Sequence, residues 1–115
     1  MNINDPVSFP RINKLMREFD LRLFRSSEQE IADTWAQFMR GGANICPQGA
    51  VAIHAVLQAR EAGVIKPTDV VVSIATASAL KFTDAGIAYH KSKGKYANPY
   101  QVVGGTLQDV EASLI

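Results

Sequence analysis

The chain has 115 residues and a net charge of +1 at pH 7, and 47% of its residues are hydrophobic and 20% charged. This is the length and composition of one soluble globular domain, so we expect a single domain over residues 1–115. The charge balance excludes the strong basic field that attracts nucleic acid or an anionic membrane, and no apolar run reaches the roughly 18 to 20 residues of a membrane span.

The redox compartment can be inferred from the cysteine content. Cys46 is the only cysteine, which excludes an intrachain disulfide and fits a reducing cytosol. Residues 1–6 have neither the basic nor the apolar part of a secretory signal. The lysine-rich residues 91–95 contain Ser and Gly as well, which is typical of a solvated loop. We therefore expect a cytoplasmic protein without nucleic-acid or membrane partners.

The first element expected is an amphipathic helix. Ser8 is suited to cap it and Pro10 to stand in its opening turn, and apolar residues follow at helical spacing: Ile12, Leu15, Met16 and Phe19. Such a helix should bury one face. Residues 21–25 are a short extended candidate after it.

The second helix has the clearest start signal in the chain. Ser27 with Glu30 three residues later is a capping box, and an apolar stripe follows at Ile31, Trp35, Phe38 and Met39. The pair Gly41-Gly42 predicts its end.

The third helix, over residues 48–62, is apolar on almost every side. A helix of this kind belongs inside a larger body, because it has no polar face to turn to water. Gly63 is the expected C-terminal cap, and residues 66–69 form the loop to the next element.

Residues 70–75 form a nearly continuous β-branched run, which predicts a strand buried on both faces of a parallel sheet. The small residues 76–79 follow it. Ligands of open α/β sheets bind at the carboxyl ends of the strands, so this turn is the favoured place for a site. Further helices are expected over residues 82–89 and 107–114.

These elements predict an α/β fold, with a partial three-layer arrangement of helix, parallel sheet and helix. A strand apolar on both faces beside a helix apolar all round needs covering layers that the chain does not supply. Either a partner chain covers these faces, or the polypeptide is a piece of something larger.

Short motifs occur in a consistent order along the chain: Asp5-Pro6-Val7-Ser8, Cys46-Pro47-Gln48-Gly49-Ala50-Val51-Ala52, Gly63-Val64-Ile65, Pro67-Thr68-Asp69, Val70-Val71-Val72-Ser73 and Leu80-Lys81-Phe82. Together they resemble the C-terminal region of threonine synthases. The resemblance implies the fold-type-II group of pyridoxal-phosphate enzymes, and the C-terminal part of their large domain. These enzymes convert O-phosphohomoserine to threonine and phosphate by γ-elimination followed by β-addition of water.

The resemblance also assigns a cofactor-binding site. Thr76 matches a Ser or Thr whose hydroxyl bonds the pyridine nitrogen of the cofactor, and so tunes the ring as an electron sink. Cys46 and Pro47 match a loop that lines the cofactor pocket, and Ala77 and Ser78 continue the turn after Thr76. From the residues alone, Thr76 is also suited to cap the next helix, and Cys46 to be a buried small hydrophobe without an activated thiolate.

The chain departs from the family in two ways. Ser78 and Ala79 stand where relatives commonly have histidine and glycine. The lysine that forms the Schiff base with the cofactor and the glycine-rich phosphate loop have no counterpart, since Lys81 is at a different position and Gly104-Gly105 is too short. No catalytic residue and no metal ligand is therefore predicted; His54 and His90 have no partner at ligand spacing.

The leading hypothesis is a C-terminal part of threonine synthase that supplies one wall of the cofactor pocket and is inactive alone. Its expected partners are the N-terminal part of the enzyme or other copies of the chain. One alternative is a non-catalytic interaction module derived from the same fold, and another is part of a related fold-type-II lyase or synthase with a different substrate. Without the attachment lysine, we expect no covalent adduct of the cofactor on this chain.

Overall fold

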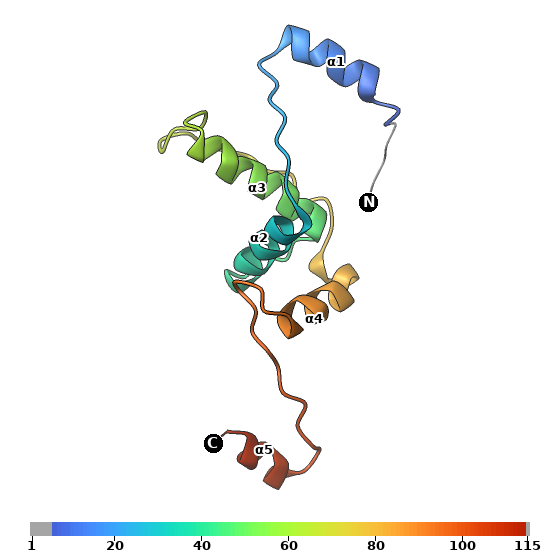
Figure 1. Cartoon of the computed structure of the whole chain (residues 1–115), viewed down its shortest axis with the longest axis vertical. Helices are drawn as coiled ribbons and strands as arrows, with labels where there is room; N and C mark the ends of the chain where they lie inside the picture. Colours follow the sequence, from blue (N-terminus) through green and yellow to red (C-terminus); the bar gives the residue numbers. More distant parts are fainter. Residues whose placement is uncertain (1–5, 115) are drawn as a thin grey trace.

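The structure is a computed structural model, and it describes residues 6–114. All secondary structure among these residues is helical (Figure 1). In chain order the elements are α1 (Phe9–Glu18), α2 (Glu28–Arg40), α3 (Pro47–Glu61), a 3-10 helix (Ala79–Phe82), α4 (Thr83–Lys91) and α5 (Leu107–Ser113). Two features discussed above, the missing secretory signal and the start of the Asp5-Pro6 motif, involve residues that lie outside this range.

The core lies where α2 packs against α3, with the 3-10 helix and α4 beside them (Figure 1). Its buried cluster consists of Trp35, Ile45, Ala50 and Ala79. The indole N–H of Trp35 donates a 2.6 Å hydrogen bond to the carbonyl oxygen of Ile45. A buried indole needs such a partner. The bond therefore fixes the ring of Trp35 in α2 against the segment that precedes α3.

α2 begins and ends as the sequence predicts. The Ser27 hydroxyl accepts a hydrogen bond from the Glu30 N–H, and the Glu30 carboxylate accepts one from the Ser27 N–H. After the last turn, Gly42 has a φ of 86°, in the left-handed region that glycine adopts without strain. Local contacts therefore satisfy the free backbone groups at both ends of α2.

Replacing Ser27 with alanine is expected to lower the free energy of unfolding by about 1 kcal/mol, because the Glu30 N–H loses its acceptor. Thr106 and Asp109 make the same capping box in α5, but α5 has no buried residue. Thr106→Ala should therefore leave the unfolding midpoint of the core unchanged. Urea unfolding followed by the fluorescence of the single tryptophan measures both variants, and equal losses would contradict the prediction.

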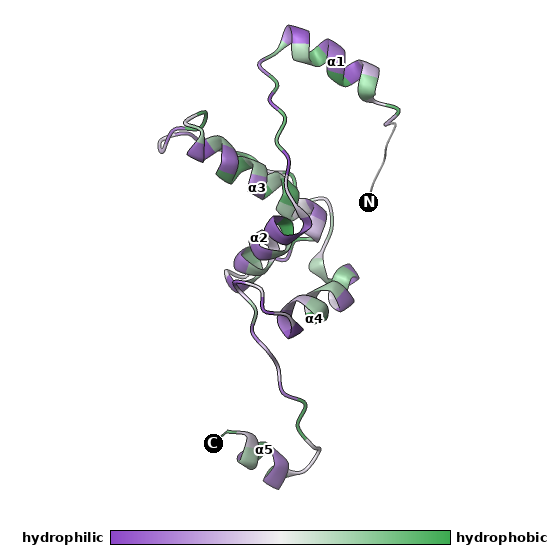
Figure 2. Cartoon of the chain, in the orientation of Figure 1, coloured by the Kyte–Doolittle hydropathy of each residue, from purple (hydrophilic) through white to green (hydrophobic). Residues whose placement is uncertain are grey.

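α1 forms where predicted, but the prediction that it buries a face is wrong for this structure. None of its residues is buried, and Phe19 just after it is 65% exposed. The side chain of Ser8 makes no capping hydrogen bond either. In Figure 1, α1 stands away from the core, so its apolar residues have no described segment to pack against (Figures 1 and 2).

The buried residues of α3 lie in its first and last turns. Gly49, Ala50 and Ala59 are buried, whereas Val51 is 38% exposed. Gly63, just after α3, has a φ of 70°, the left-handed conformation that is typical of a glycine at the C-terminal end of a helix, as predicted. The expected loop at residues 66–69 is closed by a 2.8 Å hydrogen bond from the Lys66 N–H to the Asp69 carboxylate.

The helices expected at residues 82–89 and 107–114 are both present, as α4 and α5. The first of them begins with the short 3-10 turn Ala79–Phe82, in which the Ser78 hydroxyl accepts from the Leu80 N–H. The apolar pattern therefore located both helices to within a few residues.

The predicted parallel sheet is not confirmed, because residues 6–114 contain no strand. Neither residues 21–25 nor residues 70–75 are in a regular element, and Val70 and Val72 are 94% and 88% exposed. A parallel strand exists only through hydrogen bonds to neighbouring strands, and no other described segment offers them. The β-branched run therefore lies unpaired on the surface.

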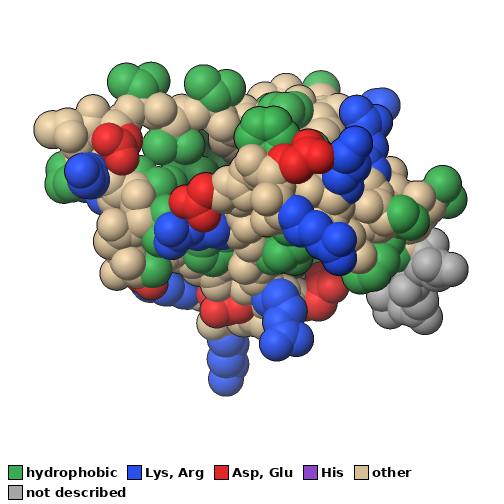
Figure 3. Space-filling model, turned by 90° about the horizontal axis from the view of Figure 1, so that it is seen from above, with side chains coloured by type: hydrophobic (Ala, Val, Ile, Leu, Met, Phe, Trp, Pro, Cys, Tyr) green, Lys and Arg blue, Asp and Glu red, His purple; other side chains and the backbone are tan. Residues whose placement is uncertain are grey.

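The molecule is elongated for its length. Its radius of gyration is 18.7 Å, whereas a compact domain of this size has about 13 Å. α1 and α5 lie at opposite ends of the longest dimension, which measures 65 Å (Figure 1). Hydrophobic side chains are spread among charged ones over the face seen in Figure 3. This shape agrees with the expectation that covering layers are missing.

Candidate functional site

The structure brings together the two segments that the sequence analysis selected. The thiol sulfur of Cys46 lies 3.4 Å from the hydroxyl oxygen of Thr76, although the two residues are 30 positions apart. The backbone N–H of Cys46 also donates a 3.0 Å hydrogen bond to the carbonyl oxygen of Ala77. The start of α3 and the end of the exposed segment 70–75 therefore meet in one place.

Cys46 is 1% exposed and caps the N-terminal end of α3. Its sulfur accepts a 3.3 Å hydrogen bond from the Gly49 N–H. Burial raises the pKa of the thiol, but hydrogen bonds from Thr76 and from backbone N–H groups outweigh it, so that the pKa lies below its usual value. The interpretation as a buried small side chain holds, whereas the interpretation that nothing nearby favours a thiolate is wrong. The sequence could not show the contact with Thr76.

Thr76 is exposed, and its hydroxyl oxygen reaches only the sulfur of Cys46 among the described side chains. The alternative that Thr76 caps the following helix does not hold, because Ser78 is the cap of the 3-10 helix. Thr76 is therefore free of a capping role and lies at the surface.

The other three predicted residues have different positions. Ala77 and Ser78 are half-buried in the turn next to Cys46. Pro47 is in the first turn of α3 and lines a small hollow against α2, together with Glu28 and Ile31. Within residues 6–114, the hydrogen-bond partner of the Thr76 side chain is Cys46 and not the neighbouring Pro47. Four of the five predicted residues thus form one cluster.

Asn44 is part of the site, although the sequence analysis gave it no role. Its side-chain oxygen accepts a 3.1 Å hydrogen bond from the Ser78 hydroxyl and a 2.9 Å hydrogen bond from the Ala79 N–H. Asn44 is exposed, and its partners lie 34 and 35 residues later, so no local pattern in the sequence indicates this role.

The remaining residues considered for chemistry lie elsewhere. Lys81 is exposed on the 3-10 helix, as expected for a surface lysine. His54 pairs with the Ser26 hydroxyl at 2.7 Å, and Nδ1 of His90 accepts a 3.0 Å hydrogen bond from the Asn98 N–H. Lysines 91, 93 and 95 are exposed in and after the last turn of α4.

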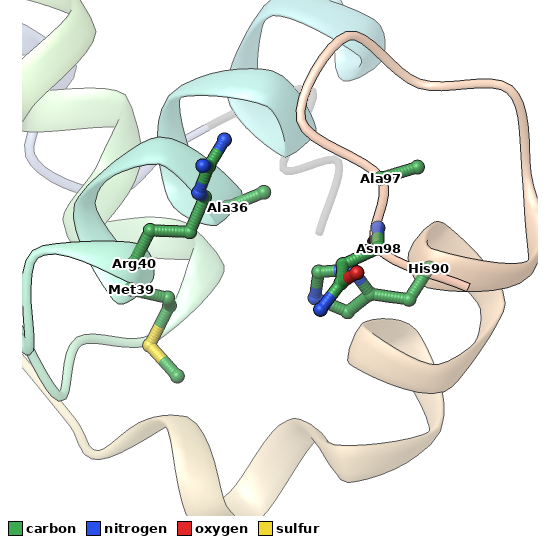
Figure 4. A pocket seen from close by; sticks show the side chains of 6 residues that line it. All are labelled: Ala36, Met39, Arg40, His90, Ala97 and Asn98. Atoms are coloured by element: carbon green, nitrogen blue, oxygen red, sulfur yellow. Dashed lines mark hydrogen bonds between the residues drawn. The ribbon is translucent and has the colours of Figure 1, made fainter. Parts of the chain in front are cut away.

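A larger hollow lies between α2 and the end of α4, with a volume of about 400 Å³ (Figure 4). Arg40 and Met39 stand on one side of it, and His90 and Asn98 on the other (Figure 4). None of the predicted site residues lines this hollow. It is therefore separate from the cluster around Thr76.

The described part of the chain lacks two other kinds of feature. It contains no group of three or more His, Cys, Asp or Glu side chains placed to hold a metal ion. Its helices are all too short or too polar to cross a membrane.

The amino-acid sequence is similar to part of a known enzyme. Over 95 residues, or 83% of its length, the chain is 35% identical to threonine synthase 2, chloroplastic, of Arabidopsis thaliana. The chain is related to a region of threonine synthase. It spans only 18% of the length of that relative. No family model matches the chain. The resemblance seen in the short motifs therefore extends over most of the chain, and it concerns one part of a much longer threonine synthase.

Proposed function

We propose that the chain is the C-terminal part of a threonine synthase, in which it supplies one wall of a pyridoxal-phosphate pocket. The observation that carries the proposal is the position of Thr76. Thr76 is exposed at the end of the β-branched segment 70–75, and its hydroxyl oxygen lies 3.4 Å from the thiol sulfur of Cys46. Residues from two distant segments, both selected by the resemblance, thus converge at one surface.

When bound, pyridoxal phosphate acts as an electron sink for carbanionic chemistry. The role of Thr76 is to donate a hydrogen bond from its hydroxyl to the pyridine nitrogen. A hydroxyl has a single proton to donate, so its direction matters. The protonated thiol of Cys46 can donate to the oxygen of Thr76 and leave that proton for the ring nitrogen. A thiolate would accept the proton instead and remove the donor from the pocket.

The residues present fit one side of the cofactor only. The hydroxyl of Thr76, an exposed residue, suits the ring nitrogen, but the chain has neither the attachment lysine nor the phosphate loop of the family. The rest of the enzyme would supply both, and it would also cover the exposed valines of the segment 70–75. In that setting the segment becomes a strand of a parallel sheet, which gives the α/β fold of the fold-type-II group. A second copy of the chain is the other candidate for this cover.

A chimera tests the proposal. The 95 aligned residues of the Arabidopsis thaliana protein are replaced by those of this chain, and the formation of threonine from O-phosphohomoserine is measured. We expect an active chimera. Thr76→Val should lower its activity roughly tenfold or more, because a lost hydrogen bond of about 1.4 kcal/mol changes a rate tenfold. Thr76→Ser should keep most of the activity, since it retains the hydroxyl.

The matched control is Thr68→Val, which changes an exposed threonine in the loop before the valine segment. It should leave the activity of the chimera unchanged. An active chimera that tolerates Thr76→Val as well as Thr68→Val would contradict the role given to Thr76. An inactive but folded chimera that binds no pyridoxal phosphate would contradict the proposed function itself.

A non-catalytic interaction module remains the second candidate, and the exposed apolar residues favour it. Phe19 and Val72 are 65% and 88% exposed. Such a module would associate with itself or a partner through these faces. It would form a stable complex in sedimentation experiments while the chimera stays inactive.

A further inference from the structure

Asn44 connects two segments that are far apart in the sequence. It lies between α2 and α3, and its side-chain oxygen accepts hydrogen bonds from Ser78 and Ala79 at 3.1 and 2.9 Å. Cys46, two residues later, bonds the carbonyl oxygen of Ala77 at 3.0 Å and contacts the hydroxyl of Thr76 at 3.4 Å. The segment 44–46 is thus joined to each of residues 76 to 79.

The position of Thr76 depends on these bonds because little else holds it. Residues 70–75, which lead to Thr76, make no backbone hydrogen bond to another part of residues 6–114. Thr76 is itself exposed, so core packing does not fix it. The turn is anchored at two places. The Cys46 N–H bonds the Ala77 carbonyl oxygen next to Thr76, and further along the chain Ala79 is buried and the side chain of Asn44 accepts two hydrogen bonds.

We propose that Asn44 is the positioning residue of this site: by holding Ser78 and Ala79, it keeps the hydroxyl of Thr76 against Cys46 and at the surface where a ligand would meet it. The functional meaning of Thr76 rests on the proposed function, but the contacts themselves do not. A purely structural role is the competing explanation, because the same oxygen satisfies the first N–H of the 3-10 helix.

The two explanations differ in what they predict for the thiol of Cys46. This is the only cysteine, so the ultraviolet absorbance of its thiolate can be titrated against a Cys46→Ser blank. The hydrogen bond from Thr76 lowers the pKa of the thiol, so Thr76→Val should raise the titration midpoint. A hydrogen bond of ordinary strength corresponds to about half a pH unit to one unit.

Asn44→Ala should raise the midpoint in the same direction, because only the bond between Cys46 and Ala77 then holds Thr76 near the sulfur. In the double variant Asn44→Ala/Thr76→Val, the shift should equal that of Thr76→Val alone, since Asn44 acts through Thr76. Asn13→Ala, in the exposed helix α1, is the matched control and should leave the midpoint unchanged. An unchanged midpoint in folded Asn44→Ala, or a full additional shift in the double variant, would overturn the proposal.

Ser78→Ala provides a second test if Asn44→Ala does not fold, as judged by circular dichroism. It removes one of the two bonds to Asn44 and the bond from the Leu80 N–H, and it leaves the Ala79 bond in place. We expect a smaller shift in the same direction, and no shift in the folded variant would overturn the proposal. The titration needs no cofactor. The proposed function alone would be rejected if the chimera is inactive while the double variant has the same thiol midpoint as Thr76→Val. The role of Asn44 alone would be rejected if the chimera is active while the two single shifts add up in the double variant.

Discussion

Replacing Trp35 with alanine is expected to abolish the cooperative unfolding of the core. Trp35 is 5% exposed at the centre of the buried cluster, and its ring lies against Gly86 of α4. Removing a buried aromatic side chain costs about 3 to 5 kcal/mol. Since small domains have a total stability of about 5 to 15 kcal/mol, and the core of this chain is small, the loss approaches the whole. Circular dichroism during urea unfolding measures it.

A second variant separates the two roles of Trp35. Trp35→Phe keeps an apolar ring but removes the N–H that bonds the Ile45 carbonyl oxygen, so it should cost about 1 to 3 kcal/mol for the unpaired carbonyl and the lost volume. Phe19→Ala is the control, because Phe19 is exposed and should change the stability by less than about 0.5 kcal/mol. A Trp35→Ala variant that unfolds as cooperatively as the original chain would contradict this account of the core.

The second large effect is a pH dependence at both ends of the scale. The Tyr89 hydroxyl donates a short hydrogen bond to the carboxylate of Asp33, and this bond holds the pKa of Asp33 below 3.8. Burial and the same carboxylate raise the pKa of Tyr89 above 10.0. Both groups therefore favour the folded state in the form that they have at neutral pH.

The direction of the pH dependence on the acid side and on the alkaline side follows from the difference between the folded and unfolded pKa of each group. The contribution of Asp33 is complete above its unfolded pKa, near 3.8, and is lost as the pH falls through its lower folded value. The contribution of Tyr89 is complete below its unfolded pKa, near 10.0, and is lost as the pH rises through its higher folded value. The free energy of unfolding should thus fall on both the acid and the alkaline side.

Tyr89→Phe should weaken the pH dependence of the stability on both the acid and the alkaline side. It should also lower the stability at neutral pH by about 1.5 kcal/mol, the lower end for a hydrogen bond to a charged group. Tyr100→Phe is the matched control, since the hydroxyl of Tyr100 makes no hydrogen bond to residues 6–114. Urea unfolding across the acid and alkaline ranges measures all three proteins. If the free energy of unfolding falls by the same amount at acid and alkaline pH in Tyr89→Phe and in the original chain, other groups cause the pH dependence.

The helices could be predicted from the sequence because their signals are local. The capping box of Ser27 and Glu30 and the left-handed Gly42 lie within a few residues of the ends that they fix. The predicted strand at residues 70–75 is different, because its existence depends on hydrogen bonds to other strands. The sequence records the tendency of these valines to be buried in a sheet, but their partners are not in the described residues.

The residues of the candidate site could be predicted from the sequence, but the contacts between them could not. The resemblance selected Cys46 and Thr76, and the structure brings them to 3.4 Å. The role of Asn44 was missed because its two partners lie 34 and 35 residues later, a distance that no local pattern reports. The lowered pKa of Cys46 was missed for the same reason, since the hydroxyl of Thr76 comes from that distant turn.

The hydrogen bonds between residues 44–46 and 76–79 also bear on the order of folding. They close a loop of little more than 30 residues, and much of that loop is the stiff helix α3. Closing a short loop costs little chain entropy, and structures built from such near contacts form fast. Residues 44–46 and 76–79 can therefore come together early in folding, before parts of the chain that are further apart in the sequence make contact.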